Sequence, residues 1–182
     1  MGSDLVTSRV ISRIGELLPP SDTIEGKPLC HLENTSISGT HTHSGPGGFL
    51  QYTLYQMTSM GYSSETMDTF VESISQSLLR AYQNLQPGTI NTSQGLLFGA
   101  NINRSPTSYL LNPKEERALY ESEGDTDKNM VLLKFTCYDG EGGLKQLGAL
   151  NWFAVHGTSM NNTNLVSIFA FPFLRGAVLG LM

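Results

Sequence analysis

Two stretches of the chain carry apolar residues at the three- and four-residue spacing of an amphipathic helix. The first stops at Pro19-Pro20, because proline breaks the hydrogen bonds of a helix interior. The second covers residues 65–85, with a serine directly before it and Pro87-Gly88 behind it. The apolar positions are Leu5, Val6, Val10, Ile11, Ile14, Leu17 and Leu18 in the first, and Met67, Phe70, Val71, Ile74, Leu78, Ala81, Tyr82 and Leu85 in the second. We predict two helices that pack into the core.

The rest of the pattern predicts strands and short helices between glycine- and proline-rich turns. Residues 130–138 and 146–155 resemble the two strands of a hairpin around the glycine-rich turn at 139–143. We also expect strands over Thr35–Thr40 and Ile90–Gly99, a helix over Phe49–Met60, and a short helix with Pro113 at its first position. The mixture predicts an α/β fold, a mixed sheet with packed helices.

Composition narrows the possible functions. The chain has 182 residues, enough for one domain with its own core. Lys and Arg number 11 against 16 Asp and Glu, so the net charge is −5 and no basic surface for nucleic acid is expected. Cys30 and Cys137 are too few for a four-cysteine zinc site or a disulfide framework. One disulfide or two free buried thiols both remain possible.

The two ends of the chain differ in character. Charged residues interrupt the apolar positions of residues 1–18, so these do not form a signal peptide. Residues 165–182 are almost entirely apolar but contain Pro172 and Arg175, and a membrane-spanning helix needs about 20 apolar residues. We therefore expect a domain at residues 1–164 and a distinct apolar tail at residues 165–182.

His41 and His43 form the first candidate for chemistry. They follow the strand expected at Thr35–Thr40, and in an extended segment side chains two residues apart point the same way. The residues that follow, Gly45-Pro46-Gly47-Gly48, have no bulky side chains, so a ligand can approach the backbone. Such a loop suits a metal or catalytic site, because neutral imidazole is a common metal ligand. A polar turn with surface histidines is the alternative.

Four further residues are candidates for chemistry. His156 comes at the end of the second hairpin strand, where it is either a ligand or a hydrogen-bonded strand-end histidine. Arg104 is a lone cation in an uncharged loop, either a clamp for an oxyanion or an ordinary surface residue. Ser44 and Ser159 are weak nucleophile candidates, since neither lies in a Gly-x-Ser-x-Gly elbow.

Several segments, in order, resemble the neutral ceramidases, zinc amidases that hydrolyse N-acylsphingosine. The resemblance covers roughly residues 5–164. It rests on Ile37-Ser-Gly-Thr-His-Thr-His-Ser-Gly-Pro-Gly-Gly, then Asn103-Arg-Ser-Pro, and Asn151-Trp-Phe-Ala-Val-His-Gly-Thr-Ser-Met. The first and last of these blocks are specific in combination.

The resemblance implies a role for each matched residue. His41 and His156 match zinc ligands of the family, although the sequence alone leaves open which ring of the His41/His43 pair takes the metal. His43 and Arg104 match residues that bind substrate and the developing charge. The implied reaction is hydrolysis of ceramide, presented at a membrane surface, to sphingosine and a fatty acid, with zinc as Lewis acid. Family members are secreted, in the endoplasmic reticulum or Golgi, or membrane-associated.

The match also implies an incomplete catalytic domain. In the family a serine in a Gly-Asp-x-Ser-Pro segment and two more zinc ligands, a Glu and a Tyr, come later in the chain. The sequence is therefore interpreted as part of a neutral ceramidase catalytic domain, with little activity alone. Two other classes remain open: a non-catalytic truncated or partner-binding protein, and an unrelated histidine metal-binding module.

Overall fold

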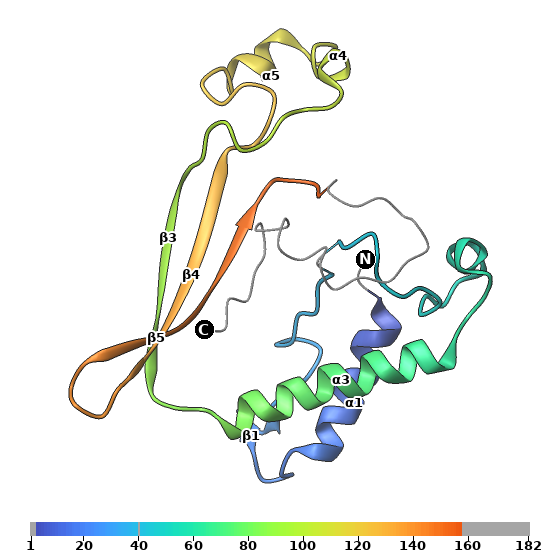
Figure 1. Cartoon of the computed structure of the whole chain (residues 1–182), viewed down its shortest axis with the longest axis vertical. Coiled ribbons are helices and arrows are strands. Elements are labelled where there is room, and N and C mark those ends of the chain that lie inside the picture. The colour runs from blue at the N-terminus through green and yellow to red at the C-terminus, as the bar shows by residue number, and fades with distance from the viewer. Residues whose placement is uncertain (1–2, 40, 158–182) are drawn as a thin grey trace. The chain divides into compact units, whose positions relative to one another are not determined.

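The computed structural model describes residues 3–39 and 41–157. These fall into two compact units, one within residues 3–85 and the other within residues 86–157. The first unit is mainly helical and the second is built on an antiparallel sheet (Figure 1). The predicted α/β class is confirmed. The predicted tail at residues 165–182 lies outside the described residues, so the boundary at residue 164 stays a prediction.

Two helices form the frame of the first unit. Helix α1 (Asp4–Leu17) begins at the Ser3 cap, whose hydroxyl accepts a hydrogen bond from the amide of Val6. Helix α3 (Ser64–Gln83) begins at Ser63, whose hydroxyl accepts from the amide of Thr66. Both predicted helices are confirmed, and α1 ends directly before the two prolines, as expected.

The apolar stripes of the two helices make the core of this unit. Val10, Ile14 and Met67 are fully buried. Val6, Val10 and Met67 form one cluster, and the partly buried residues packed against it are Leu5, Ile37, Phe49, Val71, Ile74 and Leu78. Ile37 and Phe49 come from the segment between the helices, so burial of their side chains fixes the two ends of the loop that contains the histidine pair.

Polar contacts align the same helices on their exposed side. The Arg13 Nε donates to a Glu72 carboxylate oxygen at 2.9 Å, and its Nη1 reaches Glu16 at 3.0 Å. This pairing holds the pKa of the Glu72 carboxyl below its ordinary value, and a hydrogen bond from Gln76 acts in the same direction. The same two carboxylates raise the pKa of Arg13.

The segment between α1 and α3 differs from the prediction. It contains a small hairpin of β1 (Thr23–Ile24) and β2 (Lys27–Pro28), which the sequence did not indicate. The helix expected over Phe49–Met60 is reduced to α2 (Thr53–Gln56) and the 3-10 turn η1 (Met57–Ser59). No strand is present over residues 35–39, so the strand prediction for Thr35–Thr40 is wrong over the described residues.

The second unit is a three-stranded antiparallel sheet in the order β3-β4-β5 (Figure 1). Its strands are β3 (Gly88–Leu96), β4 (Asn129–Tyr138) and β5 (Leu144–Phe153), close to the predicted ranges. Residue 88, the first of β3, has to be a glycine, because a Cβ there would lie 2.1 Å from the carbonyl oxygen of Thr136. The turn between β4 and β5 forms around Asp139, whose carboxylate accepts from the amides of Glu141 and Gly143.

A long excursion separates β3 from β4, and we call residues 97–128 the arm. The arm contains the short helices α4 (Pro106–Tyr109) and α5 (Lys114–Ala118). Pro113 lies just before α5 and not at its first helical position as predicted, with no side-chain cap. The amide of Leu97 donates to the carbonyl of Lys128 at 2.8 Å, so the arm leaves and re-enters the sheet at one place.

Two further findings bear on the sequence predictions. Cys30 and Cys137 are both free, the first partly buried and the second buried, so the single-disulfide possibility is not realised. Within the described residues, none of the helices is both long and apolar enough to cross a bilayer.

Candidate metal centre

The loop before α2 brings His41 and His43 together in the first unit. Their ring centroids lie 5.0 Å apart with the planes at 64°, an edge-to-face arrangement. Both side chains are exposed. Two imidazoles this close, and open to solvent, can present nitrogen atoms to one small ligand such as a divalent metal ion.

The two rings meet, but the predicted strand is not what brings them together. Residue 41 has a φ of 58°, in the left-handed region, and residues 35–39 form no strand. The alternation of side chains along an extended segment therefore does not orient the rings. The left-handed backbone at His41 and the bend at residues 43–45 do so instead, and a non-glycine residue in the left-handed region stores strain that is common at functional sites.

Packing on both sides holds the loop that contains His41 and His43. Ile37 before it and Phe49 after it pack against the α1/α3 core, and the Phe49 ring meets Phe70 edge-to-face at 5.0 Å. The carbonyl of Gly48 accepts a hydrogen bond from the amide of Ser63 at 2.8 Å. The loop is thus fixed to the start of α3 by backbone as well as by apolar contacts.

Ser44 does not have the exposure of a nucleophile. Its side chain is 3% exposed, and its hydroxyl has no hydrogen-bond partner among the described residues. A reacting group must be reached by its substrate, so this burial argues against a catalytic role for Ser44 in this conformation. The other serine considered, Ser159, lies outside the described residues.

His156 belongs to the second unit. It follows β5 by three residues, beyond a tight turn in which the amide of Val155 donates to the carbonyl of Phe153 at 2.9 Å. The side chain is exposed. The prediction that it follows an apolar strand is therefore correct, with a short irregular segment in between.

Arg104 lies on the arm, in an exposed bend just before α4. Its neighbour Asn103 shapes this bend: the Asn103 amide nitrogen donates to the carbonyl of Asp125, and its oxygen accepts from the amide of Ser105. Asn103, which begins an N-glycosylation sequon, is thus a structural residue here.

Sequence reasoning did not single out Asn101. Its side-chain amide bonds four groups of the second unit, including the carbonyl of Ala154, two residues before His156. The only signal in the sequence was an asparagine in a loop rich in turn formers, which does not reveal such partners.

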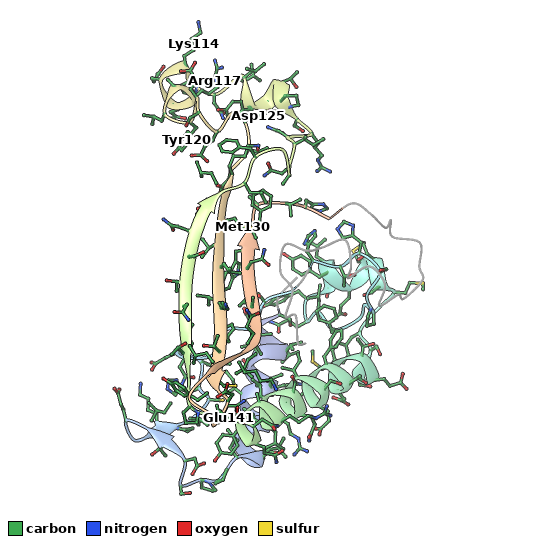
Figure 2. The ribbon with its side chains drawn as sticks, turned by 60° about the vertical axis from the view of Figure 1, so that its left-hand side comes forward. Lys114, Arg117, Tyr120, Asp125, Met130 and Glu141 are labelled. Carbon is green, nitrogen blue, oxygen red and sulfur yellow. The ribbon has the colours of Figure 1, made fainter. Side chains whose placement is uncertain are left out.

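The arm also carries an open hollow of about 700 Å³. Figure 2 shows Lys114, Arg117 and Asp125, three of its lining residues, on the arm beyond Met130 of β4. Neither Arg104 nor His156 is part of its lining. The hollow is therefore separate from the predicted site residues of this unit.

Comparison with known proteins shows which family this chain belongs to. Residues 1–168 match the family described as neutral/alkaline non-lysosomal ceramidase, N-terminal. The chain belongs to this ceramidase family. The match includes the loop with His41 and His43, the Arg104 bend and the segment that contains His156.

Individual ceramidases show the same relationship. The chain is 44% identical to the neutral ceramidase of Oryza sativa subsp. japonica over 164 residues, which is 90% of this chain and 19% of that protein. It is 47% identical to neutral ceramidase 1 of Arabidopsis thaliana, over 90% of this chain and 19% of that protein. It is 50% identical to the neutral ceramidase of Drosophila pseudoobscura pseudoobscura, over 75% of this chain and 18% of that protein. The chain spans about a fifth of the length of these relatives.

Proposed function

We propose that this chain contributes to a zinc-dependent ceramidase, an amide hydrolase that converts ceramide to sphingosine and a fatty acid. One observation carries the proposal: a chain of this family has a fixed loop in which two exposed imidazoles meet edge-to-face. The substrate would be an N-acylsphingosine presented at a membrane surface. The location would be the secretory pathway or a membrane, as expected for the family.

The proposed metal ligands are His41 and His156, with the ring of His43 beside that of His41. Each of these residues offers one ring nitrogen, and all three side chains are exposed. Zinc favours neutral imidazole ligands, and a catalytic site commonly has three protein ligands and one open position, so the donor set fits. Zn²⁺, when bound, would supply Lewis-acid chemistry at the amide carbonyl.

His43 and Arg104 are proposed to handle the substrate. The edge-to-face contact places the His43 ring beside that of His41, so His43 would lie next to the group that His41 helps to position. A guanidinium has five N–H donors and stays protonated, which suits stabilisation of the negative charge that develops on an amide oxygen. The Asn103 bonds give the Arg104 bend a fixed backbone from which to act.

Zinc binding by residues 1–182 tests the proposal through chelator competition. We expect His41→Ala and His156→Ala each to weaken zinc binding by about 100-fold, since removal of a direct ligand should cost at least as much as removal of its supporting partner. His31→Ala is the matched control, because it removes the fourth histidine from a turn outside the proposed site. Equal zinc affinity in all four proteins would overturn the metal assignment.

Activity needs a second measurement. The same substitutions, placed in a protein of the family's full length that contains this segment, should abolish hydrolysis of a fluorescent ceramide. His31→Ala should leave the rate unchanged. Full hydrolysis by the His156→Ala protein would contradict the proposed function.

A further inference from the structure

We propose that Asn101 is a positioning residue, whose side-chain amide fixes the backbone leading to His156 against the base of the arm that carries Arg104. The proposal rests on the function proposed above, because it assigns His156 to the metal and Arg104 to the substrate. Asn101 is not proposed to contact the metal or the substrate. It acts through His156 and Arg104.

Asn101 uses its full hydrogen-bonding capacity in the second unit. The amide nitrogen donates to the carbonyl of Asp127 at 2.9 Å and to the carbonyl of Ala154 at 2.8 Å. The amide oxygen accepts from the Thr126 hydroxyl at 3.0 Å and from the Lys128 ammonium at 2.9 Å. An asparagine side chain has two N–H donors and two acceptor lone pairs, so all four are used.

These partners determine which way the amide faces. Two carbonyl oxygens can only accept, and an ammonium can only donate, so a flipped amide would place acceptor against acceptor and donor against donor. The Thr126 hydroxyl also accepts a hydrogen bond from Lys128, which leaves its own proton for Asn101. The amide of Asn101 is therefore held in one orientation, with its N–H groups directed at Ala154 and Asp127.

The chain transmits this restraint over short distances. His156 follows Ala154 by two residues and Arg104 follows Asn101 by three, which limits the Cα separations to about 7 Å and about 11 Å. Asn101, Thr126 and Lys128 are all partly buried, whereas His156 and Arg104 are exposed. One amide thus anchors two segments whose exposed side chains are proposed to act in the same reaction.

The pairing of β4 with β5 ends just before the residue on which this restraint acts. The register of β4 and β5 ends at Met130 and Phe153, so Ala154 lies beyond the last paired residue. The hydrogen bond from Asn101 to Ala154 holds the chain in place for one residue beyond the last backbone pair of the sheet. Among the described residues, the other hydrogen bond of this segment runs from the amide of Val155 to the carbonyl of Phe153.

Asn101→Asp is the sharpest test, since it keeps the shape and the acceptors toward Thr126 and Lys128 but removes both N–H donors. Zinc affinity of residues 1–182 should fall by about 10- to 100-fold, as for loss of a partner that supports a ligand. An added negative charge would by itself favour Zn²⁺, so a loss reports the broken bond to Ala154. Asn91→Asp on β3 makes the same charge change away from this network and should bind zinc like the parent.

The Co²⁺-loaded chain supplies a spectroscopic readout, because its visible absorption depends on the number and geometry of the ligands. Asn101→Asp should change this spectrum and Asn91→Asp should not. In a His156→Ala background, Asn101→Asp should change neither the spectrum nor zinc affinity further, since Asn101 acts on the metal through His156. If Asn101→Asp does not fold, Thr126→Val removes one donor that orients the amide and should give a smaller loss of the same kind.

The outcomes separate the two proposals. If His156→Ala weakens zinc binding while Asn101→Asp and Thr126→Val bind like the parent, the role of Asn101 is overturned and the metal assignment stands. The role of Asn101 is also overturned if Asn101→Asp lowers zinc affinity in the His156→Ala background as much as it does in the parent. If His156→Ala itself binds zinc like the parent, the metal assignment fails and the positioning role fails with it.

Discussion

The amide of Ser63 donates a hydrogen bond to the carbonyl of Gly48 at 2.8 Å, and a Cβ at Gly48 would lie 3.1 Å from the Cβ of Ser63. Gly48 also has a φ of +85°. This close backbone approach joins the histidine loop to the cap of α3.

Gly48→Ala should therefore destabilise the first unit and disturb the histidine pair. Gly26→Ala is the matched control, because Gly26 has a similar φ of +78° but nothing within 4 Å of an added Cβ. Both variants carry the strain of a positive φ, about 1 kcal/mol or more, and Gly48→Ala adds the contact with Ser63. Thermal unfolding followed by circular dichroism should show a larger decrease in Tm for Gly48→Ala than for Gly26→Ala. An equal decrease in Tm for the two variants would contradict the role of the contact with Ser63.

Met67→Ala should destabilise the protein by about 2–5 kcal/mol, the usual cost of truncating a buried methionine. Met67 is fully buried in the α1/α3 cluster, so its truncation leaves a cavity. Met57, 69% exposed, provides the comparison, and Met57→Ala should have little effect. Denaturant titration measures both, and a similar midpoint for the two variants would show that the cluster is not the core.

The Glu72 carboxylate should make stability depend on pH in the acid range. Its pKa is lowered in the folded chain, first by the hydrogen bond from Arg13 and then by that from Gln76. Such a group stabilises the fold above its unfolded pKa, near 4.5, and that contribution is lost as pH falls through the lower folded value. Glu72→Gln should be less stable than the parent at pH 7 and equally stable at acid pH. A difference that persists unchanged at low pH would exclude this linkage.

Arg104→Ala, in a protein of the family's full length, should reduce turnover far more than stability. Arg104 is exposed, so its removal leaves no cavity, whereas loss of one donor to a developing oxyanion costs about 10²–10³ in kcat. Lys114→Ala, at an exposed position on the same arm, controls for loss of a surface cation. Steady-state kinetics with a fluorescent ceramide gives the answer, and unchanged kcat would remove Arg104 from the mechanism.

Residues 1–182 alone should hydrolyse little or no ceramide. The resemblance implies further zinc ligands and a serine beyond the matched segment, and the chain spans about a fifth of the length of its relatives. A zinc-loaded sample assayed beside a protein of full family length should show the difference. Robust hydrolysis by the shorter chain, abolished by His156→Ala, would contradict this expectation.

Local patterns explain which parts of the fold could be predicted. The two helices and the β4/β5 hairpin follow from apolar spacing, serine caps and glycine- or proline-rich breaks, all within a few residues. The strand expected at Thr35–Thr40 does not form over residues 35–39, where partly buried Ile37 packs against the α1/α3 cluster and none of the described residues pairs with the segment as a strand. The left-handed backbone at His41 was not predicted either, since positive φ is uncommon for any non-glycine residue and no local pattern marks it.

The candidate site was predicted unevenly for the same reason. Histidine and arginine stand out in an uncharged, glycine-rich context, so His41, His43, His156 and Arg104 were visible in the sequence. Asn101 was not, because its partners Thr126, Lys128 and Ala154 lie 25 or more residues away along the chain.

The arm has a consequence for the order in which the sheet folds. β4 and β5 are joined by the tight turn at residues 139–143, so their pairing requires closure of only a short loop. β3 can pair with β4 only after the whole of residues 97–128 has been looped out, and chain entropy makes that closure slower. The hairpin that leads to His156 should thus form first, and β3 should join it together with the Asn101 contacts. Slow closure of the arm would then set the rate at which His156 and Arg104 reach their final arrangement.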